Sequence, residues 1–287
     1  MNQMIKNSND YRQIKRANLC FLFCIIFEVA GIMTVLFWGS VGAQLAIYFL
    51  TMLFAVAITK KANLSIPMHP IKRKSEDDWK SNVLNLGLAI GTSICGIPIA
   101  MVLNAIANVL TNEGAQGVED ISQYSPWVSL FVFAIVPAIV EEYVFRGVIL
   151  NSLLVLGTKA AILVSSLFFA LLHFSLGSVL YGFFFGCVFS FVRLSTDNLI
   201  MTIVMHMTFN GINVLLSYAD LTKIPSWIIT MSVIIGVVGF LILFVGLIAR
   251  NPVVIEPGLY KRRCAFTKEG VVSVIICMVI IVSLLLV

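Results

Sequence analysis

Nine long apolar runs, separated by short polar or basic segments, constrain this chain more than any other feature. Each run is long enough to form an α-helix that crosses the hydrocarbon core of a bilayer, which takes roughly 17–25 residues. The runs are continuous rather than alternating, which argues against a membrane β-barrel. They lie at residues 17–38, 41–59, 81–110, 127–150, 159–176, 177–194, 198–218, 227–249 and 271–287.

The composition agrees with a chain embedded in a membrane. Of the 287 residues, 60% are hydrophobic and only 11% are charged, whereas a soluble domain carries about 25% charged residues. The six cysteines are scattered and form no pattern typical of disulfides or zinc fingers. We therefore predict an all-α fold, a polytopic membrane helix bundle of about eight or nine transmembrane helices, with eight if a terminal run does not cross.

The positions of the basic residues predict an orientation. If each run crosses once and the N-terminus is cytoplasmic, nearly all of the 19 lysines and arginines fall on the inside, and the outside collects Lys223. This distribution follows the positive-inside rule. We therefore expect a multi-pass protein of the cell membrane with a cytoplasmic N-terminus. The basic loops are explained by this topology, and we expect no nucleic-acid partner.

Three ionisable residues, Glu141, Glu142 and Arg146, interrupt the apolar run 127–150. Because charge is costly in hydrocarbon, such groups face protein or water and often mark a functional site. Neighbours on a helix point about 100° apart, so the two carboxylates are expected to differ in role. Arg146 follows Glu142 by four residues, the spacing of an ion pair, and Glu141 is then the candidate general base. The alternative is one structural charge network of all three.

Two histidines and one asparagine lie in other apolar runs. His173 belongs to the run 159–176, and both His206 and Asn210 lie on one face of the run 198–218. At about 1.5 Å per residue, Glu141, His206 and His173 lie about 14, 12 and 21 Å from the cytoplasmic ends of their runs. The side-chain N–H groups of His206 and Asn210 are suitable donors to an oxyanion. Each residue alone could equally be an interhelical hydrogen bond, but their number favours a shared site.

These motifs, in this order, resemble the CPBP family of intramembrane proteases, the CAAX protease and bacteriocin-processing family that is also called Abi. The resemblance covers roughly residues 127–218, and we divide the chain into a tail (1–16), N-terminal membrane helices (17–126), this core (127–218) and C-terminal helices (219–287). The matching motifs are Glu141-Glu142-Tyr143-Val144-Phe145-Arg146, Phe169-Ala170-Leu171-Leu172-His173 and His206-Met207-Thr208-Phe209-Asn210.

The resemblance implies a hydrolase, an intramembrane endopeptidase that cuts a peptide or a membrane-anchored protein within the lipid bilayer. Glu141 would activate a water that His173 helps to position, while His206 and Asn210 would stabilise the oxyanion. Glu142 and Arg146 would support the site. We expect no cofactor. Family members have been called both glutamate proteases and metalloproteases, and if zinc is used, its ligands would be Glu141, His173 and His206.

Two other functions compete with proteolysis. One is a non-catalytic membrane regulator or bacteriocin-immunity partner of another membrane protein, for example a membrane sensor kinase. The other is a proton-coupled transporter, which would need polar groups along a pathway across the membrane, whereas here they gather in one region. We expect a bacterial origin, for which a peptide pheromone, a bacteriocin precursor or another membrane protein is the favoured substrate.

Overall fold

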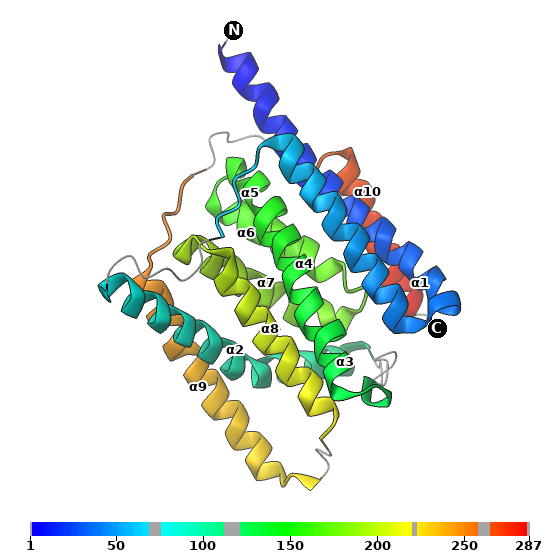
Figure 1. Ribbon diagram of the computed structural model, residues 1–287, viewed down its shortest axis with the longest axis vertical. Coiled ribbons are helices and arrows are strands. Elements are labelled where there is room, and N and C mark those ends of the chain that lie inside the picture. The colour runs from blue at the N-terminus through cyan, green and yellow to red at the C-terminus, as the bar shows by residue number, and fades with distance from the viewer. Residues whose placement is uncertain (1, 69–75, 112–120, 220–222, 258–264, 286–287) are drawn as a thin grey trace. The chain divides into compact units, whose positions relative to one another are not determined.

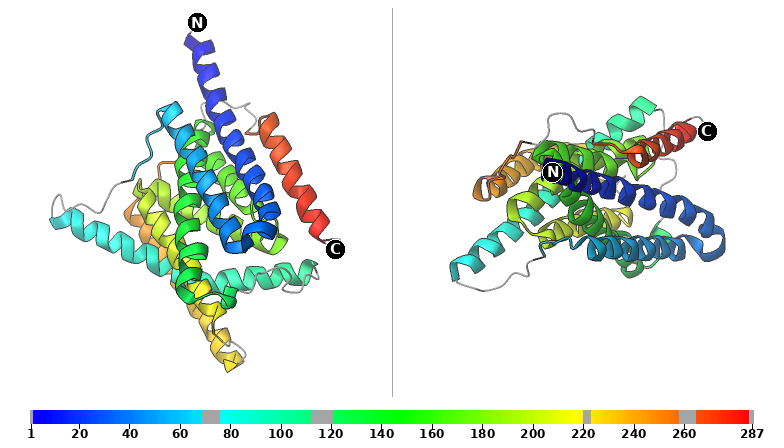
Figure 2. Two further views of the ribbon diagram at one scale, coloured as in Figure 1. Left: turned by 45° about the vertical axis from the view of Figure 1, so that its right-hand side comes forward. Right: turned by 90° about the horizontal axis from the view of Figure 1, so that it is seen from above.

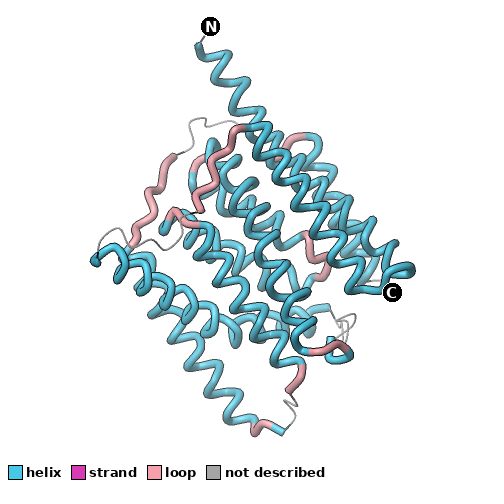
Figure 3. Tube along the Cα trace, in the orientation of Figure 1, coloured by secondary structure: helices cyan, strands magenta, loops and turns pink. Residues whose placement is uncertain are grey.

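The computed structural model describes residues 2–68, 76–111, 121–219, 223–257 and 265–285, and these are almost entirely helical (Figure 3). The other parts of the basic segments 60–80 and 250–270 and of the loop 111–126 lie outside the described residues. In the part described, no strand forms beyond one isolated bridge between Gly157 and Pro257. The predicted all-α class is confirmed.

Seven helices among the described residues are long and apolar enough to cross a membrane, so the chain is a polytopic membrane helix bundle. Two further predicted runs are also helical. Residues 17–38 form part of helix α1 (Asn2–Ala62), and the run 159–176 begins as the shorter apolar helix α6 (Thr158–Leu171). The seven are Gly39–Ala62, Lys80–Val109, Pro126–Leu156, Leu176–Thr196, Leu199–Ser217, Ser226–Arg250 and Lys268–Leu285.

The chain divides into two compact units, each built from several separate segments. The first comprises Met1–Ile66, Tyr143–Ser190 and Val254–Val287, and the second comprises Pro67–Glu142 and Phe191–Val253. The boundary at 142/143 lies directly after the predicted Glu pair.

In the first unit, α1 is a hairpin of two helical arms (Figure 2). The arms meet at Gly39, whose φ of 67° and ψ of 170° belong to a region that is essentially restricted to glycine. Phe23 of one arm packs against Phe54 of the other, with ring centroids 4.2 Å apart. The turn predicted between the first two runs is therefore confirmed.

The other helices of the first unit pack through small residues and polar side chains. A Cβ on Gly186 of α7 (Leu176–Thr196) would lie 2.9 Å from Ser166 Cβ of α6, so glycine permits a close approach of these helices. Helix α10 (Lys268–Leu285) is attached to α1 by the Lys15–Glu269 ion pair of 3.4 Å. Asn18 of α1 also donates to the carbonyl of Ala265.

In the second unit, α2 (Glu76–Thr111) and α9 (Ser226–Arg250) lie side by side (Figure 1). A Cβ on Gly236 would lie 2.8 Å from the ring of Pro98, so this contact also depends on a glycine. Helix α8 (Leu199–Ser217) packs between α2 and the helical segment that carries the Glu pair. Ser93 of α2 donates a buried hydrogen bond of 2.9 Å to the carbonyl of Met205 on α8.

The segment that carries the Glu pair is not a regular α-helix. It runs through α3 (Pro126–Leu130), the π-helix η2 (Phe131–Ile135), α4 (Val136–Glu142) and the π-helix η3 (Tyr143–Ile149). Pro137 lies two residues after the end of η2 and has no amide N–H to donate, and i→i+5 bonding is one way for a helix to pass such a residue. The helix is therefore irregular beside Pro137, and π-helices often occur at functional sites.

The predicted extent of the run 159–176 as one helix is wrong. Helix α6 ends at Leu171, and α7 begins at Leu176. Phe174 between them has a φ of 51°, a left-handed conformation that a right-handed helix cannot continue. His173 therefore lies in a turn.

Candidate active site

Three of the predicted site residues meet between α4 and α8 of the second unit. His206 lies in the middle of α8, and its Nδ1 is 2.9 Å from Glu142 Oε1. Its Nε2 is 3.8 Å from Glu141 Oε2, within ion-pair distance but beyond a direct hydrogen bond. Each of the two neighbouring carboxylates therefore lies near a different nitrogen of the same imidazole ring.

The two carboxylates differ in burial. The Glu142 side chain is fully buried, whereas that of Glu141 is 14% exposed and that of His206 is 5% exposed. A buried carboxylate is stable only when it is hydrogen-bonded, and His206 supplies such a bond to Glu142. Glu141 is the more exposed of the two carboxylates.

The hydrogen bond to Glu142 determines what the other nitrogen of His206 can do. With Glu142 ionised, Nδ1–H donates to it, so a neutral ring has a lone pair at Nε2. A protonated ring has an N–H at Nε2 as well. His206 can thus stabilise an oxyanion through Nε2 only as the imidazolium. Asn210 lies one turn further along α8 and is half-buried.

Arg146 lies in η3 and belongs to the first unit, where it is 1% exposed. Its Nη2 donates to the carbonyl of Gly186 at 3.3 Å. The guanidinium carbon also lies 4.4 Å from the ring centroid of Phe169 and 5.3 Å from that of Phe189, distances typical of cation–π contacts. The ion pair between Glu142 and Arg146 stays a prediction.

His173 is exposed and lies in the turn after α6, also in the first unit. Its Nδ1 is 2.9 Å from the carbonyl of Phe169, and a hydrogen bond there fixes the tautomer with the lone pair on Nε2. The Phe169 ring packs edge-on against the imidazole, with centroids 5.1 Å apart. Phe169 thus contacts both the histidine of its motif and Arg146.

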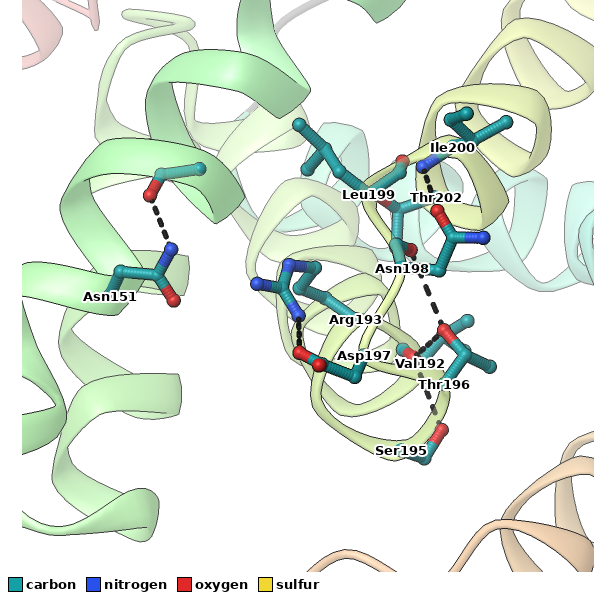
Figure 4. Close-up of polar contacts among 11 residues, drawn as sticks. Asn151, Val192, Arg193, Ser195, Thr196, Asp197, Asn198, Leu199, Ile200 and Thr202 are labelled. Atoms are coloured by element: carbon teal, nitrogen blue, oxygen red, sulfur yellow. Dashed lines mark hydrogen bonds and ion pairs between the residues drawn. The ribbon is translucent and has the colours of Figure 1, made fainter. Parts of the chain in front are cut away.

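The start of α8 is fixed by a polar turn after α7 (Figure 4). Asn198 caps α8 by accepting a hydrogen bond from the amide of Ile200 at 3.0 Å. Arg193 is 2% exposed and donates to Asp197 at 3.0 Å. Arg193 is therefore buried at this turn and paired with Asp197. The turn defines where the helix bearing His206 begins.

The predicted zinc ligands can be compared with the positions of these side chains in the structure. Among the residues that the structure describes, no group of three or more His, Cys, Asp and Glu side chains could hold a metal ion. Glu141 and His206 Nε2 supply two neighbouring donors, and a catalytic zinc site takes three protein ligands. The zinc set Glu141, His173 and His206 stays a prediction, and we derive no step through a metal.

Sequence reasoning missed two polar side chains that hold α8. One is Ser93, which bonds to the residue before His206, and the other is Tyr218 directly after α8. A serine within the apolar run 81–110 could have been noticed, because such side chains often form interhelical hydrogen bonds. Tyr218 stands at the end of a run, where aromatic residues are common for other reasons.

A family model described as Type II CAAX prenyl endopeptidase Rce1-like matches residues 123–212. No match was found among curated proteins or among solved structures. The matched stretch contains all three motifs, and the model describes an endopeptidase, which supports membrane proteolysis as the general activity. The resemblance seen in the motifs is confirmed for this stretch: residues 123–212 match a CAAX-endopeptidase family model, which is consistent with the CPBP family.

Proposed function

We propose that this protein is an intramembrane endopeptidase of the glutamate type, in which Glu141 activates the attacking water. The observation that carries the proposal is the position of His206, 2.9 Å from Glu142 and 3.8 Å from Glu141. A partly exposed carboxylate and an imidazole thus lie side by side within membrane helices. Such a pair can supply both general-base catalysis and oxyanion stabilisation.

The attack transfers one proton and moves one negative charge. Glu141 takes a proton from water, the water oxygen bonds to the peptide carbon, and the C=O π electrons move onto the oxygen. The negative charge leaves Glu141 and appears on the substrate oxygen. The Nε2–H of a protonated His206, oriented by Glu142, stabilises the charge in both positions, with the Asn210 amide as a second donor.

Collapse of the tetrahedral species completes the hydrolysis. The carbonyl re-forms, the C–N bond breaks, and Glu141 gives its proton to the leaving nitrogen, which regenerates the carboxylate. His173 enters this proposal on its motif alone, as a residue that positions the water. Arg146 and Glu142 are proposed to support the site.

The proposed substrate is a peptide or a membrane-anchored protein in the membrane of a bacterial cell. The family model takes its name from prenylated CAAX substrates, but no feature of this chain requires prenylation. In a bacterial cell a peptide pheromone, a bacteriocin precursor or another membrane protein is the favoured substrate.

The test compares membranes from cells that produce wild type, Glu141→Gln or Glu256→Gln. Glu141→Gln keeps the shape and removes the base, and Glu256→Gln makes the same change at an exposed position outside the site. New protein N-termini, identified by mass spectrometry, should appear with wild type and Glu256→Gln and be absent with Glu141→Gln. Purified protein with a chelator then tests metal dependence.

If Glu141→Gln yields the same new N-termini as wild type, the proposal fails. If neither wild type nor a variant yields new N-termini, but all three proteins alter the behaviour of a partner membrane protein, the chain is a non-catalytic regulator instead.

A further inference from the structure

We propose that Tyr218 is a positioning residue of this site, acting with Ser129 to set the register between the two helices that carry the reacting groups. This inference rests on the proposed function. Tyr218 directly follows α8, and Ser129 lies in α3, at the start of the segment that leads to Glu141. Their hydroxyl oxygens are 2.7 Å apart.

The two hydroxyls form a closed hydrogen-bond cluster with two backbone carbonyls. Tyr218 Oη lies 3.0 Å from the carbonyl oxygen of Ile121 and 2.9 Å from that of Tyr124. Ser129 Oγ lies 3.2 Å from the same Ile121 oxygen and is fully buried. The two hydroxyl protons can thus form a chain, in which Tyr218 donates to Ser129 Oγ and Ser129 donates to the Ile121 carbonyl. Since a buried hydroxyl without a partner is costly, the cluster favours one arrangement of the two helices.

The same number of residues separates the cluster from the catalytic pair on both segments. Glu141 follows Ser129 by twelve residues (141 − 129), and Tyr218 follows His206 by twelve residues (218 − 206). The helices run in opposite directions, so the same pairing register places Tyr218 at Ser129 and His206 at Glu141. A contact that fixes the register at one end therefore fixes it at the other.

This register needs a directional contact because the intervening segment is irregular and apolar. The π-helix η2 and Pro137 lie between Ser129 and Glu141. Apolar packing is non-directional, so it tolerates sliding of one helix along the other. A slip of one residue moves the carboxylate by about 1.5 Å relative to the imidazole, and a 1 Å misplacement can reduce a rate by roughly 100-fold.

The test replaces Tyr218 with Phe, which keeps the ring and removes the hydroxyl. Tyr181→Phe is the matched control, because the Tyr181 hydroxyl donates to Ser178 within the same helix, at 3.1 Å. We expect Tyr218→Phe to lower kcat by about 10-fold or more, with little change in KM, and Tyr181→Phe to behave as wild type. Ser129→Ala should reproduce the loss if Tyr218→Phe does not fold.

A second readout does not depend on activity. The chain has three histidines, so the ¹⁵N NMR signal of His206 in histidine-labelled protein can be assigned as the one that disappears when His206 is substituted. Wild type should show Nδ1 of His206 protonated and hydrogen-bonded, and Tyr218→Phe should show an altered or exchange-broadened signal.

The inference is overturned if both hydroxyl variants keep the wild-type kcat and the wild-type His206 signal. If wild type itself cleaves nothing, the proposed function fails, but the NMR comparison still decides whether the two hydroxyls position His206.

Discussion

At the scale of single residues, the different burial of Glu141 and Glu142 predicts different consequences of the same substitution. Glu142→Gln replaces a charge-assisted hydrogen bond to His206 with a neutral one, which is about half as strong. We expect a loss of about 1 kcal/mol in the free energy of unfolding and a partial loss of cleavage, because the weaker hydrogen bond holds the His206 ring less firmly. Glu141→Gln should abolish cleavage with a smaller effect on stability.

Thermal unfolding and cleavage, measured on the same detergent preparations, check this prediction. A Glu142→Gln protein as stable as wild type, beside a strongly destabilised Glu141→Gln protein, would reverse the assignment of the two carboxylates.

The residues of the site were largely predictable from the sequence, but their pairing was not. Charges and histidines stand out in apolar runs because hydrocarbon penalises them, which identified Glu141, Glu142 and His206. The expected partner of Glu142 was Arg146, from the i, i+4 spacing of a regular α-helix. The chain changes to a π-helix at Tyr143, and no sequence pattern used here signals that change. The contact between Glu142 and His206 depends on packing between distant segments.

At the scale of helices, Gly182 and Gly186, which lie four residues apart in α7, predict unequal tolerance to alanine. A Cβ on Gly186 would lie 2.9 Å from Ser166 Cβ and 3.1 Å from its Cα, so α6 or α7 must shift. Such overpacking costs about 1–3 kcal/mol. A Cβ on Gly182 would meet nothing closer than Ala170 Cα at 3.4 Å, and the gain in helix propensity is up to about 1 kcal/mol.

We therefore expect Gly186→Ala to lower the unfolding temperature and Gly182→Ala to leave it unchanged or raise it. Differential scanning fluorimetry in one detergent compares the two. Equal effects would mean that α6 and α7 do not approach each other as closely as the structure shows.

The positions of the helices were predictable where the length of an apolar run determines them. The end of α6 was not predictable. Gly39 stood between two long runs, and a turn there was expected because both runs could not form one crossing. The end of α6 at Leu171 carried no comparable signal, since residues 171–175 contain neither glycine nor proline. The left-handed conformation of Phe174 is imposed by tertiary packing rather than by local propensity.

At the scale of the whole molecule, α6 decides how many times the chain crosses the membrane. Its 14 residues extend about 21 Å, short of the ~30 Å hydrocarbon core. If α6 begins at the cytoplasmic side, the turn that contains His173 lies at membrane depth. Non-helical backbone is tolerated there only where protein surrounds it or water reaches it, and His173 is exposed rather than buried.

The side of the membrane on which residue 287 lies tests this topology. With a cytoplasmic N-terminus, nine crossings place residue 287 outside. If α6 and the turn after it do not cross, the chain crosses eight times and residue 287 lies inside. Nine crossings also keep nearly all lysines and arginines inside. We therefore expect an epitope tag after Val287 to be detected on intact cells, and a tag within residues 60–80 to be detected only after permeabilisation. Detection of both tags only after permeabilisation would show that one predicted run does not cross, and the basic residues that follow α6 would then need another explanation.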